Sequence, residues 1–138
     1  ILKNLQWISL FGNKIEDLEG DTFADLTKVV KILLASNQLK NLHHDLFKNN
    51  VKLEEVWLQD NQLEVLSRQI FRNNFELKTV YAAGNKLKKI NINFLSLPNL
   101  RIIDLTGNIC INEWCDVTDF CATSSIQQMQ SKITTKCS

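Results

Sequence analysis

The stretch LEEVWLQDNQLEVL, residues 53–66, decides the fold because its pattern recurs along the chain at an almost fixed period. Counterparts of its asparagine follow one another at intervals of 24, 24, 24 and 23 residues, and the series is Asn13, Asn37, Asn61, Asn85 and Asn108. Apolar residues alternate with other residues before each asparagine, as Val56 and Leu58 do, and this is the period of a β-strand. One such unit cannot bury its apolar face alone, whereas stacked units share a continuous core. The sequence therefore predicts a solenoid whose successive short strands pair in parallel.

The second half of the first four repeats carries a phenylalanine at a similar place, and these residues are Phe23, Phe47, Phe71 and Phe94. With the LxxLxLxxNxL pattern, they make the chain resemble the extracellular leucine-rich repeat family, in its 24-residue subtype with a phenylalanine spine. The resemblance implies an α/β horseshoe solenoid, with a curved parallel β-sheet on its concave face and a mostly irregular convex face. It places five leucine-rich repeats in residues 1–108 and a C-terminal cap in residues 109–138.

The repeated asparagines have a physical explanation that does not depend on the family. A buried amide side chain is costly unless it is hydrogen-bonded, and an asparagine can both donate and accept where the chain bends away from a strand. We therefore expect an Asn ladder, formed by the five repeated asparagines, whose side chains satisfy backbone groups of neighbouring turns.

Composition excludes several classes of protein. The chain has 138 residues, of which 44% are hydrophobic and 22% charged, so it has enough apolar material for a core and too much for disorder. Sixteen basic and fifteen acidic residues nearly balance, which disfavours nucleic acid and anionic membranes as partners. The apolar runs are far shorter than the roughly 20 residues of a transmembrane helix, so we expect no membrane insertion of this segment.

All four cysteines lie in the last 29 residues, and they are Cys110, Cys115, Cys121 and Cys137. An even set without paired CxxC spacing favours two disulfides over a metal site, and it indicates an oxidising compartment and a secreted or outward-facing protein. Four cysteines allow three pairings.

The cysteine-bearing tail is predicted to form two short helices that close the solenoid. Asn112 or a neighbouring residue would cap the first, which carries Trp114, Val117 and Cys121 on one face. Ser125 with Gln128 would cap the second, which carries Ile126, Met129 and Ile133. The tail resembles the cysteine-containing C-terminal caps of leucine-rich repeat proteins. That resemblance implies pairing of Cys110 with Cys137 and of Cys115 with Cys121.

Short sequences narrow the resemblance further. GNICIN at residues 107–112, with LFKNN and IFRNN in the repeats, resembles insect secreted leucine-rich repeat proteins, including mosquito proteins of innate immunity. Nothing before Leu5 resembles a polar or cysteine-rich starting module. We therefore expect the sequence to be a fragment without an N-terminal cap, or its apolar N-terminal edge to be covered by a second copy in a homodimer.

Strand alternation identifies the residues on the inner, concave face. Large apolar side chains, Leu33, Trp57 and Tyr81, should lie side by side there at the strand spacing of about 4.8 Å. Trp and Tyr are enriched in binding hot spots. We hypothesise a protein-binding surface whose members are Trp7, Phe11, Lys31, Leu33, Glu55, Trp57, Gln59, Tyr81 and Asp104. The alternative is that the aromatic residues only stabilise the sheet by cross-strand stacking.

Other motifs argue against an enzyme. The sequence has no GxSxG, HExxH or phosphate-binding glycine loop, and no pair of carboxylates is set up as acid and base. We expect no catalytic residue, no metal and no cofactor, and we interpret the adjacent His43 and His44 as part of a turn. No NxS or NxT sequon is present, so we expect no N-linked glycan.

A repeat scaffold does not fix its function. The resemblance to insect secreted members implies innate immune recognition or scaffolding through protein contacts. The alternatives are the outer part of a cell-surface adhesion or signalling receptor, and a secreted enzyme inhibitor.

Overall fold

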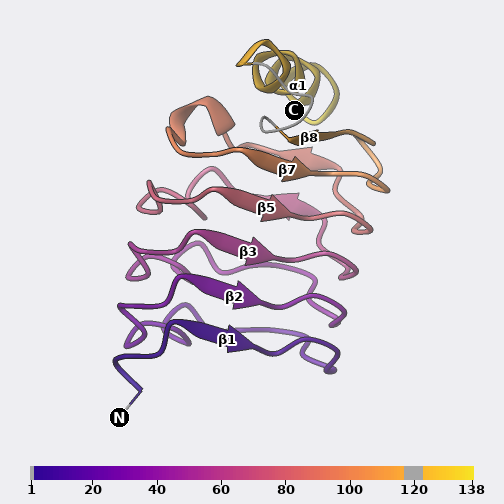
Figure 1. Ribbon diagram of the computed structural model, residues 1–138. Helices are drawn as coiled ribbons and strands as arrows, with labels where there is room; N and C mark the ends of the chain where they lie inside the picture. Colours follow the sequence, from indigo (N-terminus) through magenta and orange to yellow (C-terminus); the bar gives the residue numbers. More distant parts are fainter. Residues whose placement is uncertain (1, 117–122) are drawn as a thin grey trace.

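The computed structural model of the chain, which describes residues 2–116 and 123–138, is a parallel-strand solenoid (Figure 1). Five short strands are stacked in order: β1 (Trp7–Ser9), β2 (Lys31–Leu33), β3 (Glu55–Trp57), β5 (Thr79–Tyr81) and β7 (Ile102–Asp104). They pair in parallel and in register, so that Ile8, Ile32, Val56, Val80 and Ile103 lie opposite one another. The predicted leucine-rich repeat solenoid is confirmed.

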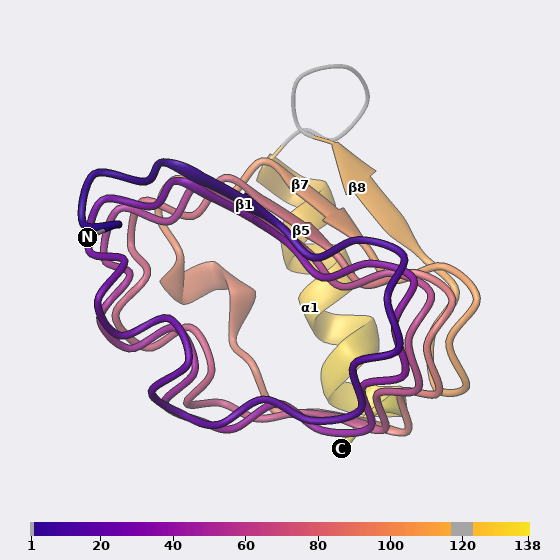
Figure 2. The same ribbon diagram turned by 90° about the horizontal axis from the view of Figure 1, so that it is seen from below.

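The opposite side of each coil has little regular structure. It contains a two-stranded parallel sheet, β4 (Val65–Leu66) with β6 (Lys89–Ile90), and one turn of 3-10 helix, η1 (Phe94–Ser96). Viewed along the stack, the coils superimpose, with the sheet of parallel strands along one side and loops along the other (Figure 2). The mostly irregular convex face is thus as the repeat pattern predicts.

The core runs through the stack without interruption. Val56, Leu58 and Leu63 are completely buried, as are most of their counterparts in the neighbouring coils. Phe23, Phe47 and Phe71 stack nearly parallel with centroid separations of 6.3 and 5.9 Å, and Phe94 is buried in the following coil. Each coil therefore completes the core of the next.

The repeated asparagines connect neighbouring coils. The Asn61 side chain donates to the carbonyls of Leu34 (3.0 Å) and Leu58 (3.1 Å), and its Oδ1 accepts from the Leu39 amide (3.0 Å). Asn37, Asn85 and Asn108 make equivalent bonds. Among the described residues, the partners of the Asn13 side chain are two carbonyls of its own coil, those of Leu10 and Phe11. The ladder thus joins coils wherever a preceding coil is present.

A second asparagine ladder, which the sequence analysis missed, runs along the convex side. Asn50 donates to the carbonyls of Phe23 (2.9 Å) and Leu26 (3.0 Å), and Asn74 donates to those of Phe47 (3.0 Å) and Asn50 (2.9 Å). Both side chains are fully buried. The doubled asparagine of LFKNN and IFRNN was the available signal, since the second of each pair is buried, whereas the first is exposed at Asn49 and half-buried at Asn73.

The residue before each ladder asparagine turns the chain with a positive φ. Glycine fills this position at Gly12, Gly84 and Gly107, whereas Ser36 and Asp60 adopt φ of 56° there. Because residues with a side chain pay a steric cost in this conformation, the second and third coils store some local strain that the ladder compensates.

The end of the stack differs from the two predicted helices. Trp114–Asp116 forms a strand, β8, which pairs antiparallel with β7. Cys115 is buried while Trp114 is exposed, which is the alternation of a strand. The prediction of a helix at Trp114 is wrong. The edge of β7 offers backbone donors and acceptors to this segment, and a helical spacing of apolar residues in the sequence does not reveal them.

One helix, α1 (Thr123–Lys136), covers the last coil. It begins two residues before Ser125, which therefore is not its N-cap. Met129, Ile133 and Cys137 are buried against the stack, and Gln130 Oε1 accepts from the Phe94 amide at 2.8 Å. Among the described residues, no helix combines the length and the apolar character needed to cross a membrane.

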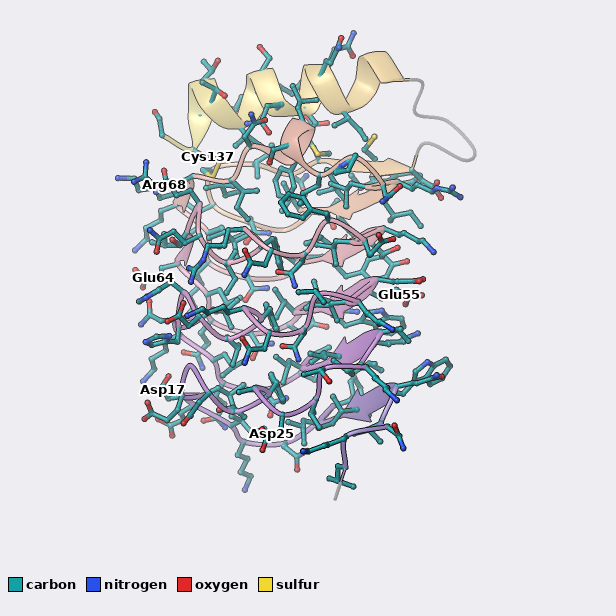
Figure 3. All side chains as sticks on the ribbon, turned by 90° about the vertical axis from the view of Figure 1, so that its left-hand side faces the viewer. Asp17, Asp25, Glu55, Glu64, Arg68 and Cys137 are labelled. Atoms are coloured by element: carbon teal, nitrogen blue, oxygen red, sulfur yellow. A yellow bond between two sulfur atoms is a disulfide. The ribbon has the colours of Figure 1, made fainter. Side chains whose placement is uncertain are left out.

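A disulfide joins this helical cap to the repeats. It links Cys110 with Cys137, the pair that the resemblance implied, and the Ile90 amide donates to the Cys137 carbonyl at 2.8 Å. Figure 3 places Cys137 at the end of the helix, against the last coils. The other predicted pair, Cys115 with Cys121, includes a residue that lies outside the described part of the chain.

Candidate binding surface on the concave sheet

The six-stranded sheet forms an exposed face whose side chains lie in rows across the strands. One row contains Trp7, Lys31, Glu55, Thr79, Ile102 and Asp116, and the next contains Ser9, Leu33, Trp57, Tyr81, Asp104 and Trp114. Most of these side chains are exposed or half-buried, while the intervening residue of each strand is buried or half-buried. The structure thus places the predicted surface residues of both rows on one face.

A third row follows the strands and includes Phe11, Ala35 and Gln59. Phe11 is exposed and Gln59 half-buried, but Ala35 is completely buried, and Thr79 in the first row is 7% exposed. By the same alternation Ala35 and Thr79 would also face solvent, and this expectation is wrong. A short side chain between longer neighbours retains little exposed surface, and a strand pattern alone does not describe this.

Lysine and tryptophan interleave at the β1 end of the face. The Lys31 ammonium lies 5.0 Å from the centroid of the Trp7 ring and 4.6 Å from that of Trp57. It also pairs with Glu55 Oε2 at 3.0 Å, and the Trp57 indole donates to the same carboxylate oxygen at 3.2 Å. Such cation–π contacts contribute roughly 0.5 to 2 kcal/mol each, so these four side chains order one another.

Tyr81 continues the aromatic row toward the other end. Its ring meets that of Trp57 edge to face, with centroids 5.2 Å apart. Partial burial raises the pKa of the Tyr81 hydroxyl, and the carboxylates of Glu55, Asp116 and Asp104 raise it further. Tyr81 therefore stays protonated at neutral pH and can donate a hydrogen bond from an acidic part of the sheet.

The β8 end adds a residue that the sequence analysis did not assign to this face. Trp114 is 57% exposed and lies opposite Asp104, whose Oδ1 accepts from the backbone and hydroxyl of Thr106 at 3.0 and 2.7 Å. The alternation of Trp114, Cys115 and Asp116 in the sequence could have indicated a strand here. Because the segment was predicted as a helix, Trp114 was not assigned to this face.

Exposure varies along the face. Trp7 and Phe11 at the β1 end are more than half exposed, and so is Trp114 at the β8 end. Leu33, Trp57 and Tyr81 in the middle are half-buried by their neighbours. The central aromatic residues thus both stabilise the sheet and present part of their surface.

A separate cluster lies at the turn of His43 and His44, with Asp45. One donor atom of each side chain lies within 4.8 Å of the others. Two of the three side chains already have partners, because His43 Nδ1 accepts from the Asp45 amide and Arg72 pairs with the Asp45 carboxylate. The Arg72 hydrogen bond lowers the pKa of Asp45 below its usual range, so this carboxylate serves a contact between neighbouring coils.

A family model for the BspA type leucine rich repeat region matches residues 2–115 in six copies. No curated protein matches the chain in the corresponding comparison.

Solved structures share the fold. The structure of the mosquito LRIM1/APL1C complex matches with a TM-score of 0.73 and 21% identity over 78% of this chain and 20% of the matched chain. The mosquito APL1 leucine-rich repeat domain gives a TM-score of 0.71 and 22% identity over 75% of this chain and 27% of that one. The structure of the TLR13–ssRNA13 complex matches with a TM-score of 0.67 and 24% identity over 72% of this chain and 14% of the matched chain. This chain therefore spans less than a third of each of these proteins.

Proposed function

The chain belongs to the family of BspA type leucine-rich repeats, and on that premise we propose that it is a non-enzymatic extracellular module that binds a protein partner with its concave sheet. The observation that carries the proposal is the row of aromatic side chains on this face, from Trp57 through Tyr81 to the exposed Trp114. Exposed aromatic clusters on a rigid sheet are characteristic of interaction sites, because they bury large areas with little loss of conformational entropy.

An innate immune role, in recognition or scaffolding, is the specific form of the proposal. It is supported by the likeness to the LRIM1/APL1C complex and the APL1 domain, and by the disulfide that ties the cap to the repeats. Disulfides persist in oxidising compartments, so the bond between Cys110 and Cys137 supports a secreted location.

The test is capture of a partner from extracellular fluid by the immobilised chain, compared with the Trp57→Ala, Tyr81→Ala double variant. We expect the partner retained by the wild-type chain to be lost from this variant. The matched control is Phe75→Ala with Leu95→Ala, which removes exposed apolar side chains away from the sheet. Equal capture by the two double variants, both folded by circular dichroism, would place binding elsewhere.

Self-association at the β1 end of the stack is a second proposal. Leu2 is exposed there, and Leu5 and Ile8 are only partly buried against the core. These residues correspond to positions that neighbouring coils bury against one another, so a second copy could cover them. Sedimentation velocity over a wide concentration range tests this: Leu2→Glu should shift the chain toward monomer, whereas Leu95→Glu should not. A chain that stays monomeric throughout would contradict it.

A further inference from the structure

A polar hollow lies on the convex side of the last coils, between the two-stranded sheet of β4 with β6 and helix α1. Its volume is about 680 Å³, within the range of roughly 300 to 1,000 Å³ that is typical of small-molecule sites. Its lining includes Ser67, Arg68 and Gln69 of one coil, Asn91 and Asn93 of the next, and Thr134 of the helix. Figure 3 shows Arg68 on the convex side, near the end of α1 that carries Cys137. The hollow is therefore separate from the concave sheet.

The sheet of β4 with β6 supplies one wall of the hollow. Leu66 lies opposite Ile90 in the register, and the Asn91 amide donates to the Leu66 carbonyl at 2.9 Å. Ile90 is buried, whereas Lys89 and Asn91 on either side of it are exposed. Because side chains alternate along a strand, Lys89 and Asn91 lie on the same, outer side of this sheet. The wall therefore presents an amide side chain with a lysine beside it.

The helix supplies the opposite wall and is fixed in place. Gln130 Oε1 accepts from the Phe94 amide at 2.8 Å, and Gln130 Nε2 donates to the Ile92 carbonyl at 3.3 Å. The Ile90 amide donates to the Cys137 carbonyl at 2.8 Å, and the disulfide holds the same cysteine. Both walls are thus held by contacts of the chain itself, and a preformed site loses little conformational entropy when it binds a ligand.

Three side chains of the hollow have unused hydrogen-bonding groups. Among the described residues, no hydrogen bond or ion pair engages the side chains of Arg68, Gln69 and Asn91. Arg72, by contrast, pairs with Asp45. The hollow therefore presents one guanidinium and two amides that are available to a ligand.

The charge at the hollow is positive. Arg68 borders it and Lys89 lies beside it, while its lining includes none of the described acidic side chains. Lys88 pairs with Glu64 at 3.3 Å, so the charge of this lysine is compensated. Counting the α-carboxylate of Ser138, which also borders the hollow, still leaves an excess of one positive charge over Arg68 and Lys89. Because a concave surface concentrates the potential of the groups that line it, an anionic group is favoured there.

We propose that this hollow binds an acidic saccharide, with a carboxylate or sulfate of the ligand on Arg68 and its hydroxyls on Gln69 and Asn91. The guanidinium offers a planar fork of donors that matches the paired oxygens of such an anionic group. Each amide has both donors and an acceptor, as a sugar hydroxyl does, whereas the carboxylates of an acidic peptide only accept. The two amides therefore favour a saccharide over an acidic peptide segment. This site is additional to the protein-binding function proposed for the concave sheet.

The first experiment titrates saccharides into the intact, oxidised chain by calorimetry. The probes are a chondroitin tetrasaccharide, which carries carboxylates only, its sulfated form, and the neutral N-acetylchitotetraose. We expect saturable binding of an acidic probe that weakens as sodium chloride is raised, and about tenfold weaker binding of the neutral one. Binding of either acidic probe supports the inference, and the tighter of the two identifies the anionic group. No saturable binding of either, or equal affinity for the neutral probe, would overturn it.

An acidic peptide is the competing ligand. Acetyl-tetraglutamate amide carries the negative charge without the sugar hydroxyls. We expect it to bind more weakly than the tighter acidic saccharide, because it leaves the acceptors of the two amides unused. Equal or tighter binding of the peptide would reject a saccharide as the ligand of the hollow.

Substitutions locate the site. Arg68→Gln removes the charge and Asn91→Ala removes an amide, and neither side chain has a partner among the described residues, so the fold should be retained. We expect each variant to bind the acidic saccharide about three- to tenfold more weakly. Lys14→Gln, at an exposed lysine of the first coil, is the matched control and should change nothing. An equal loss in Lys14→Gln would indicate unspecific attraction by charge, and unchanged affinity in the other two variants would likewise overturn the assignment.

The concave double variant separates this inference from the proposed function. Trp57→Ala, Tyr81→Ala should bind the acidic saccharide with unchanged affinity, whatever its effect on capture of the protein partner. Loss of saccharide binding in this variant, with its circular dichroism unchanged, would move the saccharide to the concave sheet and overturn the inference.

Discussion

A coil in the middle of the stack is hydrogen-bonded to a neighbouring coil on each side. The coils at the two ends of the described chain have other contacts, and these contacts differ between the two ends. Asn61 hydrogen-bonds to Leu34 and Leu39 of the preceding coil, whereas the partners of Asn13 among the described residues lie in its own coil. At the other end the last parallel strand is covered by β8, and the coil is closed by α1 and a disulfide.

This comparison locates the stability of the molecule in the interfaces between coils. A repeat has almost no core of its own, so its free energy of folding comes from what it buries and bonds on neighbouring repeats. The same residue type should then contribute more in the middle of the stack than at its β1 end. Four predictions break or sharpen the comparison.

The largest effect is expected in the middle of the phenylalanine spine. Phe47 packs between Phe23 and Phe71, so Phe47→Ala opens a cavity on both sides and should reduce the free energy of unfolding by about 3 to 5 kcal/mol. Urea unfolding followed by circular dichroism measures it. Phe75→Ala, at an exposed phenylalanine, serves as control, and an equal loss in both variants would contradict a shared core.

Removal of the cap disulfide should have the next largest effect. The bond between Cys110 and Cys137 spans a sequence separation of 27, and a closed loop of this size typically contributes about 2 to 4 kcal/mol. The Cys110→Ala, Cys137→Ala variant should therefore melt at a lower temperature in calorimetry. An unchanged melting temperature would mean that the last coil is held in place without this disulfide.

Matched asparagine substitutions compare the middle with the end directly. Asn61→Ala leaves the Leu39 amide without its acceptor and removes one of the two side-chain donors to the Leu34 carbonyl, and it should cost about 1 to 3 kcal/mol. Asn13→Ala affects exposed bonds within one coil and should cost less than about 0.5 kcal/mol. Equal costs in urea unfolding would refute the idea that the ladder acts between coils.

The smallest effect concerns the exposed ion pair between coils, Asp45 with Arg72. Because the folded-state pKa of Asp45 lies below the ordinary aspartate value of 3.8, the pair stabilises the fold above that pH, and the contribution is lost as pH falls through the folded-state pKa. Asp45→Asn should lower the melting temperature slightly at neutral pH and not in strong acid. A difference that persists in strong acid would show that the carboxylate charge is not its source.

The features that the repeats share could be predicted from the sequence because the same residue pattern occurs in several copies. Five copies of one pattern fix the period, the strand position and the buried residues, since any other register would expose the core of every coil at once. The Asn ladder follows for the same reason: Asn37, Asn61, Asn85 and Asn108 meet identical surroundings in successive coils. Lys31, Trp57 and Tyr81 could be placed on the concave face by alternation.

Features that occur once could not be predicted in the same way. Trp114 fits a helix or a strand by its local pattern, and the free edge of β7 selects the strand. Asn50 and its exposed neighbour Asn49 are alike in the sequence, and only the burial of Asn50 against the preceding coil distinguishes them.

The amino-acid sequence by itself determined the solenoid, its period and the faces of its strands, because a repeated pattern states the same local requirement in every coil. Only the tertiary structure decided which side chains and strands contact one another across coils. Examples are the contact of Lys31 with the rings of Trp7 and Trp57 and the pairing of β8 with β7. The contacts between successive coils join residues about 24 positions apart, those between β7 and β8 join residues 10 to 14 positions apart, and the geometry of both depends on how the coils stack and on how the last one is closed.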